Sequence, residues 1–165
     1  MIAAVDVDYR DPSAVAALVL FSDWPDPAPA REVTATVSAV KPYQPGMFFE
    51  RELPCIEAVL RAAGVTPDAL VVDGYAWLAP GRPGLGAHVH QALGGRVPVV
   101  GVAKTPFASA AGAVPVLRGQ SLRPLWVSAA GVDVNDAAAA VRSMHGPYRV
   151  PTLLQRVDRL CRDAP

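Results

Sequence analysis

Three short, apolar runs follow one another at the start of the chain, joined only by turn-forming or proline-rich segments. The first two, residues 2–9 ("IAAVDVDY") and 15–22 ("VAALVLFS"), are separated by the turn signal "RDPS". The third, residues 32–40 ("EVTATVSAV"), alternates apolar with small polar residues and follows a connection that holds three prolines. This order predicts an antiparallel meander of three strands at the start of the fold.

Beyond residue 40, helical and strand-like patterns alternate. Apolar residues at helical spacing predict a helix over 53–64 that ends at Gly64, with Glu52 at its start. Compact apolar runs predict further strands at 69–74, 96–103 and 123–131. Helical patterns between or after these runs predict further helices at 84–95, 134–146 and 151–163. Asp133 or Asn135 stands near the start of one helix and Pro151 in the first turn of the last. The expected fold class is α/β, a mixed sheet of three antiparallel strands and then parallel strands, flanked by helices.

Length and composition narrow the class of protein. A chain of 165 residues can bury a stable core without disulfides or structural metal ions, and we expect one domain over residues 1–165. Two cysteines, Cys55 and Cys161, are too few for a disulfide framework and indicate reduced, buried thiols. With 15 basic and 15 acidic residues, a broad basic face for nucleic acid is not expected. The first residues show no secretory leader and no apolar run could span a bilayer, so we expect a cytoplasmic protein without a membrane partner. The oligomeric state stays open, with a monomer favoured.

Three carboxylates stand where buried apolar runs begin or stop: Asp6, Glu52 and Asp73. Taken singly, an aspartate at a strand end is often a turn or capping residue. If the first and fourth strands are neighbours, Asp6 and Asp73 emerge near each other, with Glu52 above them. Carboxylates that close repel unless a divalent cation neutralises them, and oxygen ligands of this kind select Mg²⁺ or Mn²⁺. The three together therefore predict a site for a divalent cation that could act on a phosphodiester.

Two more charged residues belong to the same rim of the predicted sheet. Asp8 shares a strand face with Asp6 and is either a further ligand or a residue of the strand's wet end. Lys104 directly follows an apolar strand in "GVAKT". It is either a solvated edge charge or, beside the carboxylates, a point charge for a scissile phosphate.

Five segments, in this order, resemble the endonuclease V family: "AAVDVDY", "PYQPGMFFERELP", "LVVDGYAWLAPGRPGLGAHV", "PVVGVAKT" and "RPLWVSAAG". The likeness runs from about residue 3 to residue 160. It implies an RNase H-like fold and a nuclease that cleaves DNA, or in some members RNA, one nucleotide to the 3′ side of inosine in repair. DNA or RNA with a deaminated base would be its partner.

The resemblance also implies roles for individual residues. Asp6, Glu52 and Asp73 fall on the family's Mg²⁺ ligands, and Lys104 falls on the lysine of "G-V-A-K-S". The helix "YRVPTLLQRVD" places Asp158 at a further catalytic position. The positions implied to bind nucleic acid are Tyr43 (a wedge between prolines), Pro45, Gly46, Gly74, Tyr75 and His88.

The base-reading segment departs from the family pattern. Where the family has "D-G-H-G-x-A-H-P-R", this chain has "DGYAWLAPG". Tyr75 and Ala79 therefore stand in place of the two histidines, Ala76 in place of the second glycine and Gly81 in place of the arginine. Trp77 in this segment is either a stacking surface for a base or a packing residue, and His88 is either a site residue or a half-buried helix residue. A Mg²⁺-dependent nuclease is the leading hypothesis; a non-catalytic nucleic-acid-binding protein and a nuclease for another lesion are the alternatives.

Overall fold

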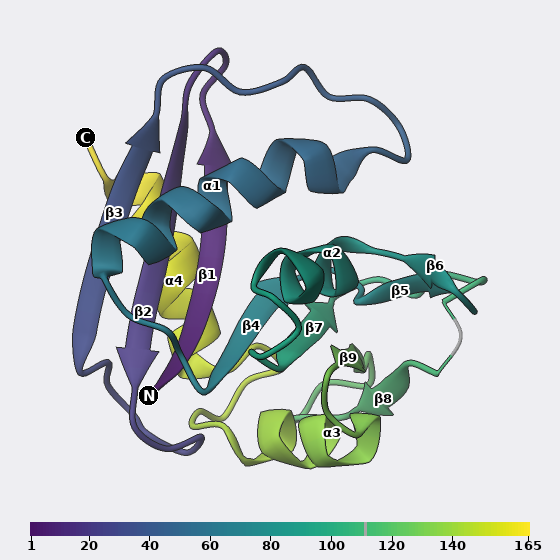
Figure 1. Ribbon diagram of the computed structural model, residues 1–165. Coiled ribbons are helices and arrows are strands. Elements are labelled where there is room, and N and C mark those ends of the chain that lie inside the picture. Colours follow the sequence, from purple (N-terminus) through teal and green to yellow (C-terminus); the bar gives the residue numbers. More distant parts are fainter. Residues whose placement is uncertain (111) are drawn as a thin grey trace.

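The computed structural model, which describes residues 1–110 and 112–165, is built on a seven-stranded sheet with the order β3-β2-β1-β4-β7-β9-β8 (Figure 1). Its strands are β1 (Ile2–Tyr9), β2 (Ala14–Phe21), β3 (Arg31–Val37), β4 (Ala69–Asp73), β7 (Val99–Ala103), β8 (Val114–Val116) and β9 (Leu125–Ala130). β1 to β3 form the antiparallel meander, and β4 and β7 continue the sheet in parallel with β1. β9 and β8 then return antiparallel. The mixed sheet confirms the predicted fold class.

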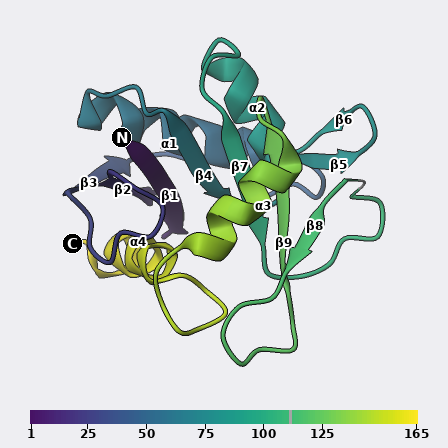
Figure 2. The same cartoon turned by 90° about the horizontal axis from the view of Figure 1, so that it is seen from below.

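Helices cover both faces of the sheet. The helices α1 (Phe48–Ala63) and α2 (Leu85–Ala92) lie on one face, and α3 (Val134–Ser143) and α4 (Thr152–Asp163) lie on the other, as Figures 1 and 2 show together. Each helix is amphipathic enough to bury one stripe against the sheet. The sheet is therefore the middle layer of three.

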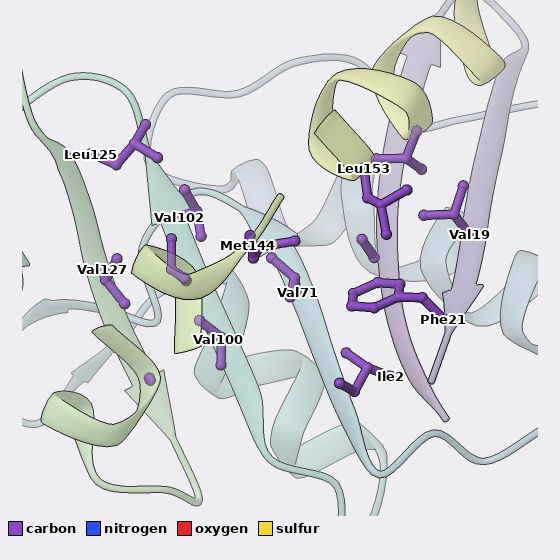
Figure 3. Close-up of a cluster of buried hydrophobic side chains, with 14 of the residues drawn as sticks. Ile2, Val19, Phe21, Val71, Val100, Val102, Leu125, Val127, Met144 and Leu153 are labelled. Atoms are coloured by element: carbon purple, nitrogen blue, oxygen red, sulfur yellow. The ribbon is translucent and has the colours of Figure 1, made fainter. Parts of the chain in front are cut away.

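Strand alternation divides the core into two layers. Val5 and Val72 belong to the cluster on the α1 side, whereas Ala4 and Val71 belong to the cluster on the α4 side. Figure 3 shows the α4-side cluster, to which Val19, Phe21 and Leu153 contribute large side chains that are fully buried. This alternation also decides to which face each strand directs its polar residues.

The helix boundaries follow capping rules. α1 ends where Gly64 adopts a left-handed conformation, with φ of 66°, and donates its N–H to Leu60 and Arg61 carbonyls. Asp133 caps α3 by accepting from the N–H groups of Asn135 and Asp136, at 2.8 and 3.2 Å. α1 starts at Phe48 rather than at Leu53, so Glu52 lies inside the helix and not at its start.

Three short strands were not predicted. β5 (Trp77–Ala79) and β6 (Arg82–Pro83) pair as a separate hairpin, and β8 adds an edge to the main sheet. Strands of two or three residues are too short to show a period-two pattern. Cys55 and Cys161 are buried and free, as predicted. In the described part of the chain, no helix is long and apolar enough to cross a membrane.

Candidate functional site

Asp6 and Asp73 lie on adjacent parallel strands at the same rim of the sheet. The register pairs Ala4 of β1 with Val71 of β4, and each aspartate lies two residues further along its strand. Both therefore point to the face that α4 covers. The sequence-based expectation that these two strands are neighbours is confirmed.

Lys104 joins the aspartates from the next strand. Asp73 pairs with Val102 of β7, and Lys104 follows two residues beyond Val102 on the same face. Asp6, Asp73 and Lys104 line one small cavity of about 30 Å³ whose remaining walls are apolar. Among the predicted residues, these three are brought together most directly.

The two aspartates hold their negative charge at a free-energy cost. The pKa of Asp6 is raised from 3.8 to about 7, first by burial and then by repulsion from Asp73 and Asp158, against the N–H of Val7, which donates to its carboxylate at 2.9 Å. Partial burial also raises the pKa of Asp73 and Lys104 opposes that shift, although the residue as a whole is exposed to solvent. A cation between the two carboxylates would relieve both penalties.

Two further acidic residues stand near this pair. Asp158 of α4 is close enough to Asp6 to raise its pKa, and it accepts a hydrogen bond from Arg162 at 2.9 Å, one turn later in the helix. Asp8 pairs with Arg10 at 3.1 Å and so behaves as a residue of the strand's wet end. Asp158, but not Asp8, therefore belongs with the pair.

Glu52 approaches from the opposite layer. Its side chain on α1 is only 4% exposed and accepts a short hydrogen bond from the hydroxyl of Tyr9. Burial raises the pKa of Glu52 to about 8, repulsion from Asp6 and Asp73 adds to the shift, and the bond from Tyr9 opposes it. The glutamate thus feels the charge of both aspartates while it is tethered to Tyr9.

Tyr9 is a site residue that sequence reasoning missed. Strand alternation turns it toward α1, away from the face of Asp6, and its ring is covered by the guanidinium of Arg51, 3.8 Å from the ring centroid. Arg51 is fixed in turn by Asp11 at 3.0 Å. The one available signal in the sequence was the spacing of three residues between Asp6 and Tyr9, which places their side chains on opposite faces of the strand.

The carboxylates have the chemistry to bind a hard divalent cation, but their side chains do not form a complete set of ligands. Carboxylate oxygens are the hard ligands that Mg²⁺ prefers, and a bound cation would also offset the repulsion between them. Across residues 1–110 and 112–165, however, no group of three acidic, histidine or cysteine side chains is placed to hold a metal ion. Asp6 and Asp73 share a cavity, and Glu52 is directed to Tyr9 instead.

The turn after β4 is held against both β7 and β9. Gly74, with a φ of 127°, donates its N–H to the carbonyl of Val102 in β7 at 3.0 Å, and Ser128 of β9 accepts a hydrogen bond from the N–H of Ala76 at 2.8 Å. Tyr75 donates its hydroxyl hydrogen to the carbonyl of Thr105 at 2.6 Å, so its ring is fixed beside Lys104's strand end. The Trp77 indole donates to the carbonyl of Ala129 at 2.9 Å and packs with small side chains, which favours the packing interpretation.

The loop before α1 presents its tyrosine to solvent. Tyr43 is 62% exposed, and Pro45 and Gly46 are exposed beside it. Phe49 anchors the start of α1 by stacking on His88, with ring centroids 3.6 Å apart. His88 is half-buried, its pKa is lowered by that burial, and it does not line the carboxylate cavity, which favours the local-packing interpretation.

Comparison with known proteins agrees with this geometry. The profile described as Endonuclease V matches residues 1–159. The endonuclease V of Streptomyces avermitilis is 34% identical over 99% of this chain and 80% of that protein. The endonuclease V of Nocardia farcinica is 31% identical over 99% of this chain and 80% of that protein.

Solved structures give the same result. The crystal structure of the Streptomyces avermitilis endonuclease V has a TM-score of 0.77 at 33% identity, covering 98% of this chain and 79% of that one. The Ciona intestinalis endonuclease V, solved with a 24mer DNA containing an inosine followed by a ribo-adenosine, has a TM-score of 0.80 at 19% identity, covering 98% and 84%. At that identity the Ciona structure shows a shared fold.

Proposed function

The chain belongs to the endonuclease V family, and from this premise we propose that it is a Mg²⁺-dependent endonuclease, with Mn²⁺ as an alternative ion. It cleaves DNA or RNA one nucleotide to the 3′ side of a deaminated base, inosine, as a step of repair. The observation that carries the proposal is the placement of Asp6 and Asp73 on adjacent parallel strands with Lys104 at the same rim. A relative of the same fold was solved with inosine-containing DNA, which supports the substrate class.

Asp6 and Asp73 hold the cation in this proposal, and Glu52 is the third ligand. When bound, a divalent cation supplies Lewis acidity to the phosphodiester and makes a nearby water more acidic. Glu52 would keep the hydrogen bond from Tyr9 through Oε2 and would hold the cation through its other carboxylate oxygen. Because all three carboxylates repel one another, ionisation of the set and cation binding are coupled.

Lys104 and Asp158 act beside the cation site. Lys104 lines the same cavity as the aspartates, and its positive charge would offset the charge that develops on the phosphate oxygens. Asp158 faces Asp6 from α4 and is kept in place by Arg162, so it is the nearest further group able to hold a proton or complete the ligand set.

The nucleic-acid-binding residues stand on two loops. Tyr43, with Pro45 and Gly46 behind it, is the exposed residue that enters the base stack, because prolines restrict the loop before binding and so reduce the entropy lost on binding. Gly74 and Tyr75 form the turn beside Asp73, where the base next to the cleaved phosphate would lie.

The test is cleavage of a duplex and a single strand with one inosine, in DNA and RNA, with Mg²⁺ or with chelator. The wild type should cut beside inosine and spare the guanosine control, and Asp73→Asn should remove the activity. Asp133→Asn is the matched control, because it makes the same chemical change at an exposed helix cap that an asparagine can also form. Absence of metal-dependent product from every substrate would overturn the proposal.

A non-catalytic nucleic-acid-binding protein is the second candidate. Two observations favour it: the departures at residues 75–81, and the lack of a group of three acidic, histidine or cysteine side chains placed to hold a metal within residues 1–110 and 112–165. It predicts binding of inosine-containing or single-stranded nucleic acid that survives Asp73→Asn, with no product even in Mn²⁺. A nuclease for another lesion would instead cut a different substrate in a panel of modified bases.

A further inference from the structure

An open hollow lies between the β8–β9 loop, residues 117–124, and the α3–α4 loop, residues 144–151. Its volume is about 560 Å³, and its lining residues are Gly119, Gln120, Ser121, Pro147, Tyr148 and Arg149. Ligand pockets have volumes of roughly 300 to 1,000 Å³. None of these lining residues is acidic.

The two loops are locked together, so the hollow is a fixed feature. Arg118 is only 6% exposed and donates to carbonyls of the opposite loop, including that of Tyr148 at 2.6 Å. Gly119 has a φ of 60°, and a Cβ there would lie 2.2 Å from the carbonyl oxygen of Pro147. Figure 2 shows the two loops running side by side below the sheet.

The two loops that form the hollow carry positive charge and no acidic side chain. Neither loop contains aspartate or glutamate, whereas the two loops carry Arg118, Arg123 and Arg149. None of these arginines forms an ion pair within residues 1–110 and 112–165; Arg118 and Arg149 bond backbone carbonyls instead. In a chain of zero net charge, this local excess favours an anion.

Tyr148 supplies an aromatic surface at the same place. It is 67% exposed, and its hydrogen bond to Arg118 uses the backbone carbonyl, so the ring is not needed to hold the loop. An exposed aromatic ring among arginines is the combination that binds single-stranded nucleic acid, where bases stack and phosphates meet cations.

The hollow adjoins the carboxylate cavity. Arg149 lines the hollow and donates to the backbone carbonyl of Lys104, and the next residue, Val150, lines the cavity that holds Asp6 and Asp73. A strand bound at the carboxylates can therefore continue into the hollow.

We propose that this hollow is a second binding site for nucleic acid, which holds an unpaired part of the strand next to the reaction site. Tyr148 stacks on a base, and Arg123 and Arg149 contact phosphates. The proposal rests on the proposed function for the identity of the strand as substrate, but the binding itself needs no cation. Both DNA and RNA offer the required phosphates and bases.

The test is fluorescence anisotropy of labelled single-stranded DNA and RNA in chelator, over a series of salt concentrations. Tyr148→Ala should weaken binding about tenfold, since stacking of one base on an aromatic ring accounts for that loss or more. Tyr148→Phe should bind as the wild type does. Arg123→Gln should lower the slope of log Kd against log salt by about 0.7, the value for one phosphate contact on a single strand.

Arg96→Gln is the matched control. Arg96 is exposed and precedes β7, at the opposite end of that strand from Lys104, so its loss should leave both affinity and salt slope unchanged. Thermal melts of each variant establish that it is folded. Tyr148→Ala tests the stacked base and Arg123→Gln tests one phosphate contact, so a loss in either variant supports the hollow.

The outcomes separate this inference from the proposed function. Loss of binding in Tyr148→Ala and Arg123→Gln supports the hollow even if no wild-type cleavage is found. Wild-type affinity and salt slope in both variants overturn the hollow, although cleavage beside inosine would still stand. If the wild type binds neither DNA nor RNA in chelator, the hollow is overturned as well.

Discussion

Tyr9, at the end of β1, donates its hydroxyl hydrogen to the carboxylate of Glu52 on α1, the helix that covers this face of the sheet. The contact joins the strand that carries Asp6 to the helix that carries the third proposed ligand. It also lowers the pKa of Glu52 against the burial that raises it to about 8. Tyr9 is therefore a positioning residue whose loss should be visible in the pH dependence.

Tyr9→Phe should slow cleavage about ten- to hundredfold near neutral pH, because hydrogen bonds to charged groups contribute about 1.5 to 3 kcal/mol. Without the hydroxyl, the pKa of Glu52 rises further, and the carboxylate must ionise before it binds a cation. The acid limb of the single-turnover rate should therefore move to higher pH. Unchanged limbs in a profile from about pH 6 to about pH 9 would show that Tyr9 only packs.

Asp6→Asn should stabilise the ion-free protein while it removes cleavage. The folded-state pKa of Asp6 is about 7 against an ordinary 3.8, so the folded state binds this proton more tightly than the unfolded state. Stability is then greatest below the ordinary pKa and is lost as pH rises through about 7. A tenfold change in proton affinity corresponds to about 1.4 kcal/mol, so the penalty is on the order of a few kcal/mol.

Urea unfolding in chelator at acidic and alkaline pH measures this effect. The wild type should lose free energy of unfolding between the two conditions, and Asp6→Asn should lose less. An equal loss in both proteins would contradict the claim that ionised Asp6 lowers the stability of the folded state.

Mg²⁺ should raise the Tm of the wild type at alkaline pH, because a ligand that binds only the folded state stabilises it. Asp6→Asn and Asp73→Asn should lose this increase, and Asp133→Asn should keep it. A thermal-shift titration with Mg²⁺ and Ca²⁺ measures it. An increase of the same size in all four proteins would place the cation elsewhere.

Tyr43→Ala should impair cleavage of an inosine duplex more than cleavage of the same sequence as a single strand. The exposed ring is proposed to enter the base stack, a step that a single strand does not require. Phe48→Ala is the matched control, since Phe48 is 41% exposed in the same region and has no proposed contact with bases. Equal losses on duplex and single strand would tell against the wedge.

Much of this fold follows from local sequence patterns. β1 spans Ile2–Tyr9, the predicted range, because its apolar run and turn signals are unambiguous, and Gly64 ends α1 as expected. The rim that holds Asp6, Asp73 and Lys104 also followed from the sequence, since parallel strands bring their carboxyl ends to one edge of a sheet.

The parts that sequence patterns missed depend on contacts between distant residues. The Tyr9–Glu52 bond joins residues 43 positions apart, and Arg118 reaches across 30 positions to Tyr148. Neither pair leaves a periodic signal. The start of α1 at Phe48 likewise depends on Phe49 stacking against His88, a contact between two helices.

The most direct test of the central claim is a crystal soaked in Mn²⁺ and measured for anomalous scattering. The proposal predicts a peak at metal–oxygen bonding distance, about 2 Å, from carboxylate oxygens of both Asp6 and Asp73, with an oxygen of Glu52 at the same ion. A peak that is absent from this rim in the wild type, or that persists there in Asp6→Asn with Asp73→Asn, would contradict it.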